Sequence, residues 1–257
     1  MWLLVIEAPA DPAVAALAGA VTQLAAADLR HRLQGTLPRV LMSHVDGERL
    51  AAIGERLQPL GFVTVVCDPR LAPTDADRVL ARALRLQGDA CVAIDGAGGE
   101  HDCPWSALDV VQRGVRVSRQ VTKEKKVERK FDATRAVLSS GLILTRKEEK
   151  EIVRTTEASE PFALLQRNDG EPDIILYERR IDYRFLGRDM QPSSRANLEQ
   201  AVRQIRAAAA SALYEDRVAR PGFVGGLGAL SGPADPVDQG LFAVSLALRR
   251  RRESAAG

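Results

Sequence analysis

The residues best suited to a chemical role are the lysines, because all six lie within one 28-residue window of this 257-residue chain. The surrounding basic arm, residues 113–150, holds twelve Lys or Arg against five Asp or Glu, a net charge of +7. Residues 1–112 carry a net charge of −5. The near-neutral total of +2 therefore conceals an acidic segment that is followed by a basic one. Like charges this dense repel one another unless they are solvated or face an anion. The predicted partner-binding residues of the basic arm are Lys123, Lys125, Lys126, Arg129, Lys130, Lys147 and Lys150.

Two interpretations of the basic arm stay open. It is either a solvated arm or β-hairpin extension, in which Glu124 and Glu128 neutralise part of the charge, or a contact surface for an anionic partner. That partner would be an acidic protein face, a nucleic acid or an anionic membrane, and binding would weaken steeply with salt. Phe131 is the only aromatic residue in the arm, which argues against a platform that stacks single-stranded bases.

The cysteines and a histidine offer a second kind of chemistry. His101 with Cys67, Cys91 and Cys103 would provide one nitrogen and three sulfurs for zinc. Structural zinc sites usually contain cysteines two to four positions apart, and this chain has no such pair. Buried thiols that pack as small apolar groups are therefore the better interpretation of Cys67 and Cys91.

Catalysis would need a nucleophile with a base in reach. Cys103 and His101 lie two positions apart and would share one face of a strand, but Asp102 would point the other way and could not orient the base. The DGAGGEH sequence that starts at Asp95 lacks the Gly-Lys-Ser/Thr of a phosphate-binding loop and is predicted to be a turn. We predict no catalytic residue, no metal ligand and no cofactor.

The composition indicates an ordinary globular protein, with 46% hydrophobic and 27% charged residues. No apolar run approaches the 18 residues of a membrane-spanning helix. The apolar start lacks the positive charge of a signal peptide, since the first basic residue is Arg30. Three cysteines in no disulfide pattern predict a reducing, cytoplasmic location.

Residues 1–68 predict the order strand, helix, helix, strand, helix, strand. The strands are short apolar or β-branched runs, and the helices have apolar residues at intervals of three and four. Asp11 and Asp46 are placed to begin the first and third helices, and Gly61 to end the third. The predicted strands are Trp2–Ala8, Arg39–Val45 and Phe62–Cys67, and the second helix is Ala26–Leu33.

This order resembles the C-terminal domain of the ribosomal stalk protein and the related ClpS adaptor fold. The resemblance covers residues 1–68 and lies in the sequences DGERLAAIGERL and LQPLGFVTVV and in the two consecutive helices after the first strand. It implies a small α/β sandwich used for protein contacts. The stalk protein's surface Lys and Gly positions are mostly Ala here, so binding of translation factors is not implied. A receiver-like domain is the rival, but the strand that ends in Ser43 and His44 lacks the clustered carboxylates of phosphoacceptor chemistry.

The remaining sequence predicts a second domain and so an α+β fold. Residues 69–87 are expected to form a connecting helix, and residues 88–217 a β-rich domain capped by a helix over 193–213. A pleckstrin-homology-like topology is one form that this domain could take. Asn168-Asp169-Gly170 predicts a hairpin turn, and Ser193 or Ser194 the start of the capping helix. The predicted strands are Ala90–Ile94, Ala136–Thr145, Phe162–Gln166, Ile174–Glu178 and a further one through Ile181, Tyr183 and Phe185.

Residues 218–257 are predicted to form a linker and a docking segment. The stretch 218–240 contains six glycines and three prolines, a linker composition. The apolar run Leu241–Leu248 is too short for a stable membrane anchor, so docking onto the body, a partner or a second copy is favoured. Four arginines follow the run and join the predicted partner-binding residues: Arg249, Arg250, Arg251 and Arg252.

We therefore predict a non-enzymatic adaptor or assembly protein that acts through protein–protein contacts. The alternative is a protein that binds a polyanion, either nucleic acid or an anionic membrane, through the basic arm. A third hypothesis is an enzyme whose site forms only in the folded chain, around His101, Cys103 and Trp105. The identity of the partner and the oligomeric state stay open.

Overall fold

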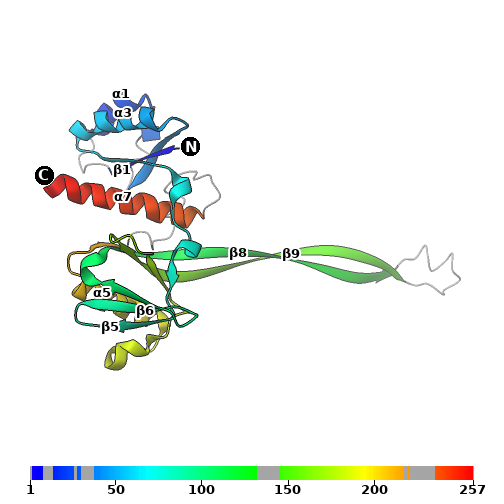
Figure 1. Ribbon diagram of the computed structural model, residues 1–257. Helices are drawn as coiled ribbons and strands as arrows, with labels where there is room; N and C mark the ends of the chain where they lie inside the picture. Colours follow the sequence, from blue (N-terminus) through cyan, green and yellow to red (C-terminus); the bar gives the residue numbers. More distant parts are fainter. Residues whose placement is uncertain are drawn as a thin grey trace. The chain divides into compact units, whose positions relative to one another are not determined.

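Figure 1 shows the computed structural model of the chain, which describes residues 2–7, 14–25, 28–29, 38–131, 145–216, 219 and 235–256. Side chains are described in these ranges except at 15–16, 118–158 and 256. The chain divides into two units: unit 1 is Met1–Val115 with Pro161–Gly257, and unit 2 is Arg116–Glu160. No helix in the described ranges is long and apolar enough to cross a lipid bilayer.

The N-terminal part of unit 1 follows the predicted order of elements, although most of the second helix, Ala26–Leu33, lies outside the described residues. The three strands form an antiparallel sheet in the order β2-β1-β3. The elements are β1 (Trp2–Glu7), α1 (Val14–Thr22), β2 (Arg39–His44), α3 (Gly47–Leu57) and β3 (Val63–Cys67).

The apolar run of β1 is continuous because both of its faces are buried. Leu4 and Ile6 pack with α1 and α3, whereas Leu3 and Val5 pack against the C-terminal helix α7 (Pro236–Ala256). A strand covered on both faces has no need for alternating polar residues. The carboxylate of Asp46 begins α3 as predicted by accepting hydrogen bonds from two backbone N–H groups of its first turn.

The connecting helix predicted for residues 69–87 is wrong. The segment contains two 3₁₀ turns, η2 (Pro69–Leu71) and η3 (Asp75–Asp77), and two strands, β4 (Val79–Leu80) and β5 (Ala83–Leu86). The apolar residues that suggested a helix are divided between two sheets, because β4 pairs with β10 (Ile174–Tyr177) and β5 with β6 (Ala90–Ile94). Strand pairing, over a long sequence separation for β4 and with the next strand along the chain for β5, thus overrides a helix-like spacing.

The rest of unit 1 confirms the α+β class, although its sheets do not confirm a pleckstrin-homology-like topology. One sheet has the order β11-β8-β9-β10-β4 and the other β5-β6-β7. The large hydrophobic cluster that joins them also buries α5. The elements not yet given are β7 (Glu100–Pro104), η4 (Trp105–Ala107), β8 (Leu108–Phe131), β9 (Thr145–Arg167), α5 (Ser194–Ala208) and β11 (Leu213–Glu215).

The predicted hairpin and the start of the capping helix are confirmed. β9 and β10 pair antiparallel, and residues 168–173 connect them, with Gly170 at φ 87°. Ser193 accepts a hydrogen bond from the backbone N–H of Ala196 at the start of α5. The helix ends at Ala208 rather than near residue 213, where β11 begins instead.

Two other sequence predictions are wrong in this region. The strand predicted through Ile181, Tyr183 and Phe185 is a 3₁₀ segment, η5 (Tyr183–Asp189), with Gly187 at φ 55° inside it. The linker predicted for 218–240 ends earlier, because Pro236 is the first residue of α7, and residues 220–234 lie outside the described chain. Most of the predicted strand Ala136–Thr145 also lies outside it, and Thr145 begins β9.

Candidate functional site

The basic arm lies mainly in unit 2, where the described backbone consists of residues 116–131 of β8 and 145–160 of β9. The two strands are neighbours in the five-stranded sheet, so the lysines occupy positions on two paired strands. Their side chains fall among those not described. The predicted residues Lys123, Lys125, Lys126, Arg129 and Lys130 belong to β8, and Lys147 and Lys150 to β9.

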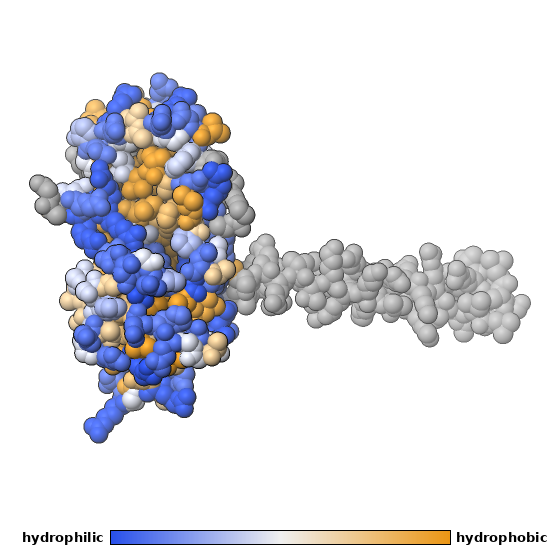
Figure 2. All heavy atoms as spheres, in the orientation of Figure 1, coloured by the Kyte–Doolittle hydropathy of each residue, from blue (hydrophilic) through white to orange (hydrophobic). Residues whose placement is uncertain are grey.

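The C-terminal segment docks onto the chain's own body, as one of the sequence predictions allowed. In Figure 1, α7 lies between the N-terminal sheet and the β-rich part of unit 1. One face packs on the five-stranded sheet through Val237, Leu241, Val244 and Leu248. The opposite face packs on β1 and β3, where Phe242 and Leu246 stay partly exposed. Figure 2 shows apolar surface over this part of unit 1.

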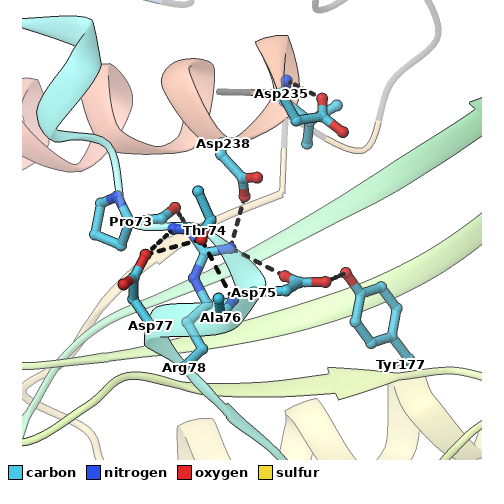
Figure 3. Close-up of polar contacts among 10 residues, drawn as sticks. Pro73, Thr74, Asp75, Ala76, Asp77, Arg78, Tyr177, Asp235 and Asp238 are labelled. Carbon is cyan, nitrogen blue, oxygen red and sulfur yellow. Dashed lines mark hydrogen bonds and ion pairs between the residues drawn. The ribbon is translucent and has the colours of Figure 1, made fainter. Parts of the chain in front are cut away.

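A buried ion pair fixes the start of α7. Arg78 Nη1 lies 2.6 Å from Asp238 Oδ1 of α7 and 3.2 Å from Asp75 Oδ1, and its Nη2 donates to the carbonyl of Pro73 at 2.7 Å. The hydroxyl of Tyr177 donates to the other oxygen of Asp75 at 2.5 Å (Figure 3). The side chains of Arg78 and Asp238 are only 1% and 2% exposed. Strands β4 and β10 are thereby connected to α7 through charges shielded from water.

A second buried carboxylate holds the end of α7. Asp109 of β8, 3% exposed, accepts bonds from Arg249 Nε and Arg252 Nη2, both at 2.5 Å. Arg251 pairs with Glu7 at 3.0 Å, and Arg250 with Glu253 at 3.4 Å. The structure therefore places the four predicted partner-binding arginines in ion pairs within the chain. Charged pairs of this kind position α7 and leave less positive charge for a partner than the sequence alone indicates.

The trio His101, Cys103 and Trp105 is not assembled into one site. Cys103 and Trp105 are buried in the large cluster of unit 1, while His101 faces an open cavity of about 670 Å³. His101 Nε2 lies 3.0 Å from Asp95 Oδ2, and this bond, with backbone N–H groups of the turn, holds the pKa of Asp95 below its usual range. The cavity is lined by no Cys, Ser or Thr that could act as a nucleophile.

Cys67 and Cys91 pack as predicted, as buried free thiols, and Cys103 is a buried free thiol as well. Cys91 and Cys103 face each other across β6 and β7. Hydrogen bonding between these two thiols raises the pKa of Cys91, with burial adding to the effect, and lowers that of Cys103. Cys67 lies in a separate cluster with Leu3, Val5 and Ala243. The described residues contain no group of three or more His, Cys, Asp or Glu that could hold a metal ion.

Sequence analysis missed the residues that position α7, chiefly Arg78, Asp109 and Asp238. Asp109 could have been noticed, because it stands alone in the apolar run from Ala107 to Val111, and a charge in a buried strand needs a partner. Nothing in the local sequence of Arg78 indicates a partner 160 positions away.

Comparisons with family models, with curated proteins and with solved structures gave no match to this chain.

Proposed function

We propose that this protein is a non-enzymatic adaptor or assembly factor that binds another protein through the strands of unit 2. The proposal is supported by the architecture of unit 2, which in its described part is a two-stranded β-ribbon. A two-stranded ribbon has no second layer on which to bury a face and is only marginally stable in water. A bound partner would supply the missing layer.

The length and charge of the ribbon fit a contact surface. Sixteen residues of β8 lie in unit 2, from Arg116 to Phe131, which corresponds to about 54 Å of strand. All six lysines of the chain lie on the two strands. We therefore propose an acidic protein face as the partner. A cytoplasmic location belongs to the same proposal and is supported by the three free cysteines.

A second candidate function, binding to a polyanion, is favoured by the pattern of charge along β8. Cations occupy odd-numbered positions at 119, 123, 125 and 129, and the acidic residues Glu124 and Glu128 both occupy even-numbered ones. Alternate positions of a strand belong to opposite faces of a ribbon. The odd-numbered series thus has four positive charges and no negative one, a pattern that suits a row of phosphates.

The experiment that tests the adaptor proposal is site-specific photo-crosslinking in the native cell. The crosslinker is placed at Val121 or Val127 of β8, which belong to the same odd-numbered series as the four cations, with exposed Glu55 of α3 as the control position. We expect one discrete protein adduct from the β8 positions that is absent from the control. The adduct should disappear when the four odd-numbered cations are changed to Gln. Adducts with nucleic acid alone would favour the second candidate, and no adduct would contradict both.

Purified protein separates the two candidates further. Binding to duplex DNA, RNA and anionic vesicles is measured at low and physiological salt. The odd-series variant R119Q/K123Q/K125Q/R129Q is compared with the even-series control R116Q/K126Q/K130Q. Salt-steep binding that only the odd-series variant loses would support the polyanion candidate. Absence of binding to all three would leave the protein partner.

A further inference from the structure

We propose that α7 is a releasable strap, and that the groove it fills is a binding site for a partner helix of the same charge pattern. That pattern is an acidic residue, an apolar stripe, and basic residues eleven and fourteen positions after the acidic one. The inference concerns unit 1 alone and stands independently of the function proposed for unit 2.

The groove recognises two opposite faces of the helix. Val237, Leu241, Val244 and Leu248 recur at intervals of four and three and pack on the five-stranded sheet. At 100° per residue, Phe242, Ala243 and Leu246 point to the opposite side, where they meet β1 and β3. A helix that enters this groove must therefore be apolar on two sides, which sets it apart from an ordinary surface helix with one apolar stripe.

A third, charged stripe sets the direction of the helix. Asp238, Arg249 and Arg252 share one side of α7, because eleven and fourteen residues are close to three and four helical turns. Arg78 receives the carboxylate at the start of the helix, and Asp109 receives both guanidinium groups near its end. A helix inserted in reverse would place like charges together, so the groove selects both sequence and orientation.

The composition of α7 suits a helix that leaves the groove and returns. Asp238, Gln239 and Ser245 are each 1% exposed, although a permanent core helix would gain more from apolar residues there. Gln112 Nε2 donates to the carbonyl of Leu241 at 3.3 Å, but its buried Oε1 has no hydrogen-bond partner in the part of the chain that the structure describes. Twenty residues separate Glu215, the end of β11, from Pro236, so α7 can move away without pulling on the sheet.

The chain contains its own reporter of release. Cys67 is buried beneath α7, whereas Cys91 and Cys103 are buried in the large cluster with α5. If α7 leaves while the rest stays folded, a thiol reagent reaches Cys67 and not the other two. If α7 leaves only when unit 1 unfolds, all three thiols become accessible together.

The first test is therefore the labelling rate of each cysteine in the intact chain, measured by mass spectrometry. We expect Cys67 to react at least tenfold faster in Asp238→Asn than in the wild type, and at least tenfold faster than Cys91 and Cys103 in the same variant. Glu100→Gln, which removes an exposed ion pair with Arg85, is the matched control and should leave all three rates unchanged. Equal labelling rates of all three cysteines in Asp238→Asn would overturn the strap.

The second test addresses the groove as a helix site and needs no substitution in the body. A protease site is inserted within residues 220–234, the folded protein is cleaved, and a labelled peptide of residues 235–256 is added in excess. We expect the peptide to replace the cleaved helix and to elute with the body. A peptide with Asp238→Lys, Arg249→Glu and Arg252→Glu should not do so. No exchange, or equal exchange of both peptides, would overturn the proposed site.

Discussion

Arg78 and Asp238 lie 160 positions apart in the sequence and form an ion pair of 2.6 Å from which water is almost completely excluded. Transfer of two charges from water into the interior is costly, and attraction offsets this cost only where every partner is in place. Asp75 and the carbonyl of Pro73 add partners for the two terminal nitrogens of Arg78, whereas its buried Nε has no hydrogen-bond partner among the described residues (Figure 3). The pair therefore determines where α7 docks more than how strongly it is held.

Removing one partner of this pair should destabilise the protein strongly. We expect Asp238→Asn to lower the free energy of unfolding by about 3 kcal/mol, because Arg78 is left buried with an incomplete set of acceptors. Urea denaturation followed by circular dichroism measures the change. Glu100→Gln should cost less than about 1 kcal/mol, because the Arg85–Glu100 pair is exposed to solvent. Equal losses in the two variants would contradict the argument.

The double variant Arg78→Met/Asp238→Leu tests the Arg78–Asp238 ion pair by removing both charges together. We expect it to be more stable than Asp238→Leu alone, because no charge is then left opposite an apolar group in α7. Denaturant titrations of the wild type, the two single variants and the double variant complete a double-mutant cycle. Additive losses would mean that the two residues do not interact in solution.

Much of the fold could be predicted where local patterns decide it. The three N-terminal strands, the turn at Gly170 and the start of α5 at Ser193 each depend on neighbouring residues. Apolar runs bounded by turn residues, a glycine with positive φ and a serine that caps a helix are all visible in a short window of sequence.

Contacts between distant parts of the chain could not be predicted in this way. The spacing of Val79, Leu80, Ala83 and Leu84 fits a helix. Val79 and Leu80 form a strand only by pairing with the distant β10, whereas Ala83 and Leu84 pair with β6, the next strand along the chain. The arginines that follow Leu248 suggested a surface for partners, but Asp109 binds two of them and lies 140 and 143 positions away from them. The candidate groove beneath α7 depends on these long-range contacts, so it could not be predicted from any short stretch of the sequence.

Burial of Cys67 makes the free energy of unfolding depend on pH in the alkaline range. Loss of water around the thiol, with a smaller effect of the charge of Asp68, raises the pKa of Cys67 to about 12, against about 8.5 in an unfolded chain. Between these values unfolding releases a proton, so the folded state loses stability as the pH rises. We expect the free energy of unfolding of Cys67→Val to fall less steeply above pH 8.5 than that of the wild type. Denaturation at several pH values measures both slopes, and identical slopes would contradict the assignment.

Asp68 should contribute at the acid end of the pH range. The hydrogen bonds from the side chain and backbone N–H of Arg70 lower the pKa of Asp68 to about 2, against about 3.9 in an unfolded chain. The resulting stabilisation is present above the unfolded value and is lost as the pH falls through about 2. We expect Arg70→Gln to raise the pKa of Asp68 in a carboxyl-carbon NMR titration. Asp77, which is held by Thr74, is the internal control and should titrate as in the wild type.

The packing of β8 on β9 leaves no room for a side chain at Gly114. A Cβ atom there would lie 2.9 Å from Phe162 Cε1 and closer still to Cζ, and the ring is fully buried. The Phe162 ring also packs on Tyr177 with centroids 5.9 Å apart, so it cannot turn aside freely. We expect Gly114→Ala to lower the free energy of unfolding by about 1–3 kcal/mol, as overpacked cores do. Thermal and urea denaturation measure the change.

Gly88→Ala is the matched control for this substitution. A Cβ atom at Gly88 would meet nothing within 4 Å, so the change should stay within about 0.5 kcal/mol. The second substitution Phe162→Leu, made on Gly114→Ala, should recover part of the loss, because the shorter side chain frees the space that the methyl group needs. If Gly114→Ala proved as stable as Gly88→Ala, β8 and β9 would be packed less closely in solution than the contact with Phe162 requires.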